Sequence, residues 1–211
     1  MSPLLNAGTA RKRRERIVRA ALRCFSRRGF HRTSMSDLLA EAGVSAGAFY
    51  TWFDSKEAVI EAACARSGDT AHREIAEALA GDDVPEALAR LLRLASSMFD
   101  RRGWRDESRV NVQVVAEAVH DARMRRAFAP AHDRFRGLIA ETVRRGQARG
   151  QIAADLDADA AAHVVWGLYL GLEQQKALDG ALDHRAFAKV AVALVTGRFA
   201  SAEAREGKAR R

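Results

Sequence analysis

The sequence predicts an all-α protein of about nine helices, three in a small N-terminal domain and the others in a larger helical bundle. Its 211 residues are rich in alanine, arginine, leucine and glutamate and include only 3 prolines, a composition that favours helices. Apolar residues recur at intervals of three and four. No segment shows the alternation of a half-buried strand or a repeat of fixed period.

The first helix opens at the basic cluster Arg11–Arg14, and residues 1–10 are expected to form a flexible arm. Its apolar face is indicated by the spacing of Ile17 and Ala21. Gly29 ends the helix, because glycine readily adopts the left-handed conformation found at helix ends.

Two shorter helices follow the first. Thr33 and Ser34 offer an N-cap for a helix over residues 35–42. Ser45 caps a third helix, which is expected to run to about Phe53.

Asp54 and Glu57 form a predicted capping box that starts a longer fourth helix. Further breaks are expected at residues 81–85, 103, 120–121, 129–130, 150–157 and 180–183. The last two helices are expected at about 157–178 and 183–202. The chain is thus divided into a helix-turn-helix domain (11–56), a bundle domain (57–204) and a basic C-terminal tail (205–211).

The positive charge is concentrated at the N-terminus. Residues 1–56 contain 11 lysines and arginines against 4 aspartates and glutamates, whereas residues 57–211 contain 24 against 23. Because attraction to phosphate depends on the local density of cations, this distribution favours a polyanion-binding head. The alternative is a solvated, arginine-rich surface without a partner.

Neither metal binding nor export is indicated by the sequence. Cys24 and Cys64 lie in apolar helical patterns without metal-ligand spacing, so reduced, buried thiols are expected. The six histidines show no metal-binding spacing either, and no cofactor is expected. The N-terminus lacks the apolar stretch of a signal peptide, and the longest apolar run, residues 160–172, is too short to span a membrane. A cytoplasmic protein is the expectation.

Residues 35–53 fit a helix-turn-helix. This motif needs apolar side chains facing inward from two short helices, supplied here by Leu38, Val44, Phe49 and Phe53. Gly43 permits the tight turn between them. The small residues 46–48 allow the start of the third helix to approach a DNA major groove closely.

The segment MSDLLAEAGVSAGAFYTWFDSKEA, residues 35–58, resembles the TetR/AcrR family of bacterial regulators, and the resemblance extends over residues 12–62. It implies a homodimer that represses transcription, less often activates it, and leaves double-stranded DNA when a small-molecule effector occupies the C-terminal domain. Leu39 departs from the family pattern, which usually has alanine there, and Trp52 stands where histidine or tyrosine is common. Neither departure conflicts with the assignment.

The same resemblance implies DNA-contacting residues. Four are candidate phosphate contacts: Ser34, Tyr50, Trp52 and Lys56. Four others are candidates to face base edges: Ser45, Ala46, Ala48 and Thr51. As alternatives, the two aromatic side chains pack under the next helix and the lysine is a solvated charge.

An enzymatic interpretation also exists, because residues 43–47 match the G-x-S-x-G motif of serine hydrolases. That motif requires a preceding strand. A helix is predicted there instead, and Ser45 serves as a helix cap, so no enzyme is expected.

The last two predicted helices carry apolar stripes wider than one neighbouring helix usually covers, with small residues that permit close approach. The predicted dimer interface comprises Val164, Leu168, Gly171, Leu172, Phe187, Val190 and Leu194. An ordinary intramolecular helix pair is the alternative.

An effector pocket is expected inside the bundle, and the effector is not identified by the sequence. Its candidate lining comprises Met98, Phe99, Trp104, Val115, Val119, Phe128, Phe135, Trp166 and Tyr169, most of which fit an ordinary core equally well. Four polar residues are candidates to orient a ligand: Gln113, Glu117, His120 and Glu173.

Overall fold

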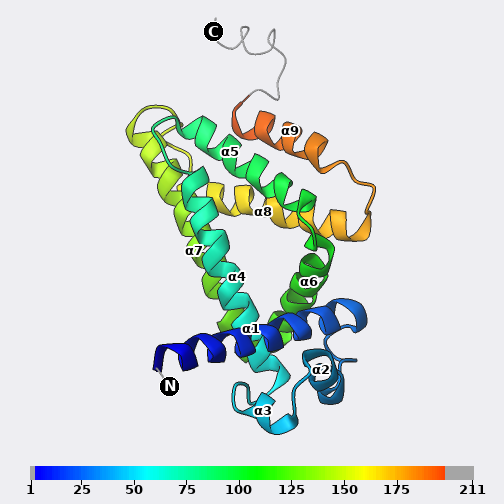
Figure 1. The fold of residues 1–211 in the computed structure, drawn as a ribbon. Helices are drawn as coiled ribbons and strands as arrows, with labels where there is room; N and C mark the ends of the chain where they lie inside the picture. Colours follow the sequence, from blue (N-terminus) through cyan, green and yellow to red (C-terminus); the bar gives the residue numbers. More distant parts are fainter. Residues whose placement is uncertain (1–2, 198–211) are drawn as a thin grey trace, which may run out of the picture. The chain divides into compact units, whose positions relative to one another are not determined.

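The computed structural model describes residues 3–197, without the side chains of residues 3–9, 64, 66 and 67. This part of the chain contains helices and turns and no β-strand, which confirms the all-α prediction (Figure 1). The helices are α1 (Pro3–Arg28), α2 (Met35–Ala42), α3 (Ala46–Tyr50), α4 (Lys56–Ala78), α5 (Val84–Ser97), a 3₁₀ turn η1 (Met98–Asp100), α6 (Trp104–His120), α7 (Ala122–Ala148), α8 (Ala158–Leu178) and α9 (His184–Val195). None of these helices has the length and apolarity needed to cross a bilayer.

Helix α1 begins earlier than predicted. It starts at Pro3, so residues 3–10, expected as a flexible arm, are helical. Proline is well suited to the first helical position because its missing N–H has no partner there. The leucines and alanines that follow are good helix formers. At the other end, Gly29 has φ +85° and follows the last helical residue, as predicted.

Three further boundaries differ from the prediction. Helix α3 ends at Tyr50 rather than near Phe53. Helix α4 begins at Lys56, and Ser55 rather than Asp54 caps it, because the Ser55 Oγ accepts the Ala58 amide at 3.2 Å. Pro130 does not end a helix as predicted but lies inside α7, although a proline there removes one backbone hydrogen bond.

The chain forms two compact units. One contains residues up to Asp69 together with Arg105–Pro130, and the other contains Thr70–Trp104 together with the residues from Ala131 onward. The prediction differed, since it assigned all residues from 57 to 204 to a single bundle domain. The tail predicted at 205–211 lies outside the described residues. The last helix, expected to run to about residue 202, ends at Val195 instead, and Gly197 follows with φ +68°.

The first unit, the head unit, has a core built from α1–α4, α6 and the start of α7. Its largest fully buried side chains are Ile17, Phe25, Leu38, Phe49, Val59, Ile60, Val114 and Met124. Cys24 belongs to this core, and burial raises the pKa of its thiol. The second cysteine, Cys64, has its side chain outside the described residues.

Helix α6 is joined to the end of α1 by hydrogen bonds within the head unit. The Gln113 side chain accepts the Phe30 amide at 2.7 Å. Ser26 donates to Asp106 at 2.5 Å, and His31 lies 2.5 Å from the Glu117 carboxylate. Gln113 and Glu117, predicted as ligand-orienting residues, therefore support the loop between α1 and α2.

The second unit, the body unit, has a core of residues from α4, α5, α7 and α8, against which α9 packs. Its buried side chains include Ile75, Leu79, Val84, Leu88, Leu91, Phe135, Ile139, Val165 and Trp166. Helices α5 and α9 run side by side (Figure 1). Lys176, only 8% exposed, donates to the carbonyl oxygens of Gly180 at 2.8 Å and Leu182 at 2.5 Å and so fixes the α8–α9 loop.

Candidate nucleic-acid interface

Capping residues hold α2 and α3 in a helix-turn-helix. Ser34 caps α2 in a capping box, with Asp37 as the reciprocal partner. Gly43 ends α2 at φ +61°, a left-handed conformation that a side chain would strain. Ser45 then caps α3 by accepting the Ala48 amide at 3.3 Å. The predicted inner residues Leu38, Phe49 and Phe53 are buried, whereas Val44 is half-buried.

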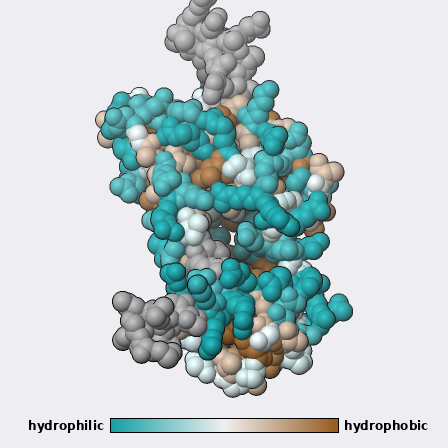
Figure 2. All heavy atoms as spheres, in the orientation of Figure 1, coloured by the Kyte–Doolittle hydropathy of each residue, from teal (hydrophilic) through white to brown (hydrophobic). Residues whose placement is uncertain are grey.

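The amino-terminal part of α3 presents small side chains to solvent. Ser45 and residues 46–48 are all at least partly exposed. Figure 2 shows pale and brown atoms of low polarity in the area of α3, next to hydrophilic atoms. The Thr51 hydroxyl donates to the Gly47 carbonyl at 2.9 Å, which leaves its methyl group and oxygen lone pairs for an outside partner.

Two of the predicted phosphate contacts are exposed. Tyr50 is 52% exposed, with its ring edge-on to Phe49 at 5.6 Å between centroids. Ser34 is exposed, but its hydroxyl interacts with Asp37 and Ser36. Hydrogen bonds from the Ser34 amide and hydroxyl, with a smaller contribution from Arg28, hold the pKa of Asp37 below its usual range.

Lys56 does not present its charge as predicted. Its Nζ donates to the carbonyl oxygens of Phe30 at 3.0 Å and Thr33 at 3.3 Å, and lies 4.5 Å from the centre of the Phe30 ring. The ammonium group therefore joins the start of α4 to the loop between α1 and α2. In this structure its hydrogen bonds are made within the head unit, and not toward solvent where a phosphate would lie. Trp52 is half-buried against the head core, as the packing alternative predicted.

Helix α1 carries four cations that remain available. Lys12, Arg13, Arg16 and Arg19 are exposed, and none has a side-chain hydrogen bond or ion pair among the described residues. By contrast, Arg23 and Arg27 pair with Glu41 of α2, which lowers the pKa of that carboxyl. The N-terminal concentration of charge was predicted, but these side chains were not among the predicted site residues. Their spacing places them on the side of the helix opposite its apolar positions, and this pattern could have identified them as an exposed cationic face.

Three of the seven residues of the predicted dimer interface are exposed apolar side chains on α8 and α9. Val164 is 65% exposed, Val190 50% and Leu194 46%. Leu168, Gly171 and Phe187 are half-buried. Leu172 is a correction, because it is 2% exposed and belongs to the interior of the body unit.

The residues predicted to line an effector pocket fall into separate groups. Val115 and Val119 are 43% and 64% exposed in the head unit and line neither side of a described pocket. His120 is also exposed, and Phe128 packs against the head core.

In the body unit, the Trp166 ring packs at a tilt against Phe135 and Tyr169, with centroid distances of 5.0 Å and 4.9 Å respectively. The Trp166 indole donates to His132, whose pKa is lowered by burial. Met98, Phe99 and Trp104 lie near the end of α5, where Phe99 contacts both Trp104 and His184. Glu173 is buried, 9% exposed.

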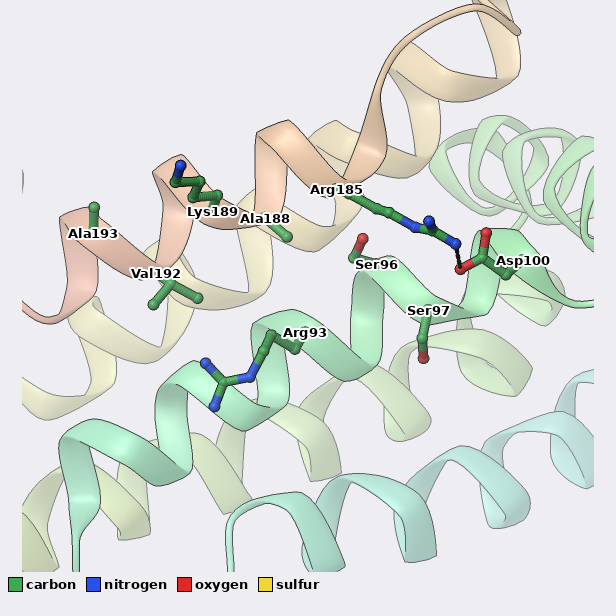
Figure 3. Close-up of a pocket in the computed structure, with 9 residues that line it drawn as sticks. All are labelled: Arg93, Ser96, Ser97, Asp100, Arg185, Ala188, Lys189, Val192 and Ala193. Atoms are coloured by element: carbon green, nitrogen blue, oxygen red, sulfur yellow. Dashed lines mark hydrogen bonds and ion pairs between the residues drawn. The ribbon is translucent and has the colours of Figure 1, made fainter.

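A groove that the sequence analysis missed lies between α5 and α9, with a volume of about 590 Å³ (Figure 3). Its lining is Arg93, Ser96, Ser97, Asp100, Arg185, Ala188, Lys189, Val192 and Ala193. None of the predicted pocket residues is among them. The pairing of α5 with α9 depends on long-range packing, which no local pattern indicated.

Comparison with known proteins supports the regulatory interpretation. A family model described as "Bacterial regulatory proteins, tetR family" matches residues 17–63. Another, described as "BetI-type transcriptional repressor, C-terminal", matches residues 87–200.

Among curated relatives, the HTH-type transcriptional regulator UidR of Escherichia coli is 25% identical over 164 residues, which cover 77% of this chain and 81% of the relative. The HTH-type transcriptional regulator TtgR of Pseudomonas putida is 28% identical over 171 residues, covering 77% and 79%.

Solved structures share the fold. Salmonella enterica GusR has a TM-score of 0.75 at 25% identity and covers 94% of this chain and 97% of its own. The fatty acid degradation regulator FadR from Bacillus halodurans has a TM-score of 0.77 at 20% identity, covering 88% and 95%. One family model matches the helix-turn-helix segment, and the other, over residues 87–200, matches more than half of the chain. This chain therefore belongs to the TetR family of bacterial transcriptional regulators.

Proposed function

We propose that the chain is a homodimeric repressor that binds a pseudo-palindromic operator and leaves it when a small molecule binds the body unit. The observation that carries the proposal is the exposed, small-faced start of α3 in a head unit whose α1 carries unpaired cations. In such a dimer each α3 enters a major groove, and the half-sites lie about one helical turn, or a multiple of it, apart.

Affinity and sequence preference come from different residues in this proposal. Arg16, Arg19 and Tyr50 contact phosphates, which positions the protein on any duplex. The methyl groups of Ala46, Ala48 and Thr51 face base edges, where thymine methyl groups and groove shape are the natural targets.

Selection of bound duplexes from a random pool tests the proposal directly, and a recovered inverted repeat is the expected result. Salt dependence then measures the phosphate contacts. Replacing Arg16 and Arg19 by glutamine lowers the slope of log K against log salt by about 1.8 per protomer, since each phosphate contributes about 0.9. The matched control replaces Arg125 and Arg126, which are exposed on α7 of the same unit and have no side-chain partner among the described residues, and keeps the wild-type slope. Equal slopes for both double variants contradict the role of α1.

The exposed face of α8 and α9 supports the homodimer. Val164, Val190 and Leu194 form an apolar surface on a chain that is otherwise rich in charge, and such surfaces mark association sites. Gly167, also exposed, permits close approach of a second helix. Val164→Arg is expected to convert the dimer to a monomer in sedimentation equilibrium, while Leu156→Arg, at another exposed apolar position in a loop, leaves it a dimer.

Small-molecule response is proposed from the relatives. One neighbouring structure is the transcriptional regulator FadR of Bacillus subtilis in complex with stearoyl-CoA. A factor of 100 in operator release requires a coupling free energy of about 2.7 kcal/mol between effector and DNA. Titrating candidate molecules into the protein–operator complex and following release by fluorescence anisotropy tests this part.

A further inference from the structure

We propose that the groove between α5 and α9 binds an amphipathic organic anion, a molecule with one acidic head and an apolar chain. Binding itself is independent of DNA recognition, whereas the regulatory consequence rests on the proposed function. The groove lies wholly within the body unit, and its volume of about 590 Å³ is in the range of small-molecule sites, about 300–1,000 Å³.

Three of the residues that line the groove from α9 are apolar. Ala188 is 6% exposed, and Val192 and Ala193 are half-buried, so an aliphatic chain lying here removes their remaining surface from water. Figure 3 shows Val192 and Ala188 directed toward α5 from one face of α9.

The charged residues of the lining favour an anion. Three are cationic, Arg93, Arg185 and Lys189, and the single carboxylate is Asp100. That carboxylate is already compensated, because it accepts a bond from Arg185 at 3.1 Å and lies 3.4 Å from the His184 Nε2. The groove therefore has a surplus of positive charge.

Two of the cations are available to an acidic head. Lys189 is exposed and has no side-chain partner among the described residues. Arg93 lines the groove from α5, and among the described residues its side chain pairs with Glu86 of the same helix, with both side chains about half exposed. Figure 3 shows the Arg93 side chain lying along α5. Such a surface pair contributes little free energy, so a ligand carboxylate can replace Glu86 at small cost.

Helix α9 connects this groove to the proposed dimer interface. Arg185, Lys189 and Val192 lie on its groove side, while Val190 and Leu194 are exposed on another side of the same helix. A ligand that shifts α9 relative to α5 therefore changes the surface offered to a second copy. This gives the anion a route to alter DNA binding, in proportion to its differential affinity for the two arrangements.

Calorimetric titration of the full-length protein with decanoate tests the binding step. Decanoate is expected to bind, whereas acetate, which lacks the chain, and decyltrimethylammonium, which reverses the charge, do not. Arg93→Gln combined with Lys189→Gln is expected to weaken decanoate binding at least about tenfold, because charge-assisted hydrogen bonds are lost. Arg73→Gln, an exposed arginine of the same unit outside the groove, keeps wild-type affinity.

A second variant separates loss of charge from loss of structure. Ala193→Trp keeps every cation and occupies the groove, and is expected to abolish decanoate binding while circular dichroism and the thermal midpoint stay near wild type. Equal affinity in the wild type and in both groove variants, or no binding to the wild type, overturns the proposal. Operator binding is measured in parallel. If it is absent while decanoate binds as expected, the proposed function fails and the groove assignment stands.

Discussion

Lys56 offers a sharp test, because its predicted and observed roles have different consequences. Its ammonium donates to the carbonyls of Phe30 and Thr33 at 3.0 and 3.3 Å and lies over the Phe30 ring. Hydrogen bonds to charged groups contribute about 1.5–3 kcal/mol and an exposed cation–π contact about 0.5–1 kcal/mol. Because Lys56 is only half-buried, we expect Lys56→Met, which retains most of the aliphatic stem, to destabilise the loop between α1 and α2 by about 2 kcal/mol.

Hydrogen exchange measures this destabilisation locally. The amide of Phe30, bonded to Gln113 at 2.7 Å, is expected to exchange about thirtyfold faster in Lys56→Met, the factor that corresponds to about 2 kcal/mol. Lys12→Met, which removes an exposed lysine of the same unit, leaves that rate unchanged. Unchanged exchange in Lys56→Met, together with a salt slope of DNA binding that falls by about one, would refute the structural role and restore the phosphate contact.

Three other predictions follow from single positions. A Cβ at Gly146 meets Val84 at 2.9 Å and Ile152 at 3.0 Å, so Gly146→Ala is expected to destabilise the fold by about 1–3 kcal/mol. A Cβ at Gly137 meets nothing within 4 Å, so Gly137→Ala is expected to stabilise the fold by up to about 1 kcal/mol. Thermal midpoints that move in the same direction in the two variants contradict this prediction. Since the pKa of Asp37 is depressed in the fold, its stabilising contribution is present above the pKa of the unfolded chain and is lost as pH falls through the lower folded value. Urea titrations between about pH 5 and pH 2 should therefore show a smaller loss of stability in Asp37→Asn than in the wild type. Ala48→Gln is expected to change the duplexes recovered by selection without changing the salt slope, and an unchanged consensus argues against base contact at this position.

Local signals in the sequence account for much of the helix-turn-helix. Ser34, Gly43 and Ser45 occupy the predicted capping positions, because a cap depends on residues only three or four apart. Helix α8, expected at about 157–178, spans Ala158–Leu178, and its Asp157 cap was not predicted.

Long-range contacts account for what the sequence did not predict. The position of the Lys56 side chain depends on a carbonyl 26 residues away, and the burial of Leu172 depends on the packing of other helices against α8. Val119 illustrates the same limit, because the apolar pattern of α6 did not indicate which positions face solvent.

The participation of α6 in the head unit bears on hybrid regulators, in which the N-terminal helix-turn-helix segment of one protein is joined to the remainder of another. Phe30 and Ser26 are bonded to Gln113 and Asp106, 83 and 80 positions further along the chain. A recombinant protein that joins the N-terminal helix-turn-helix segment of one regulator to the remainder of another replaces one side of this joint and not the other. Hybrid regulators are therefore expected to tolerate the exchange only when residues 105–130 come from the same parent as the operator-reading helices.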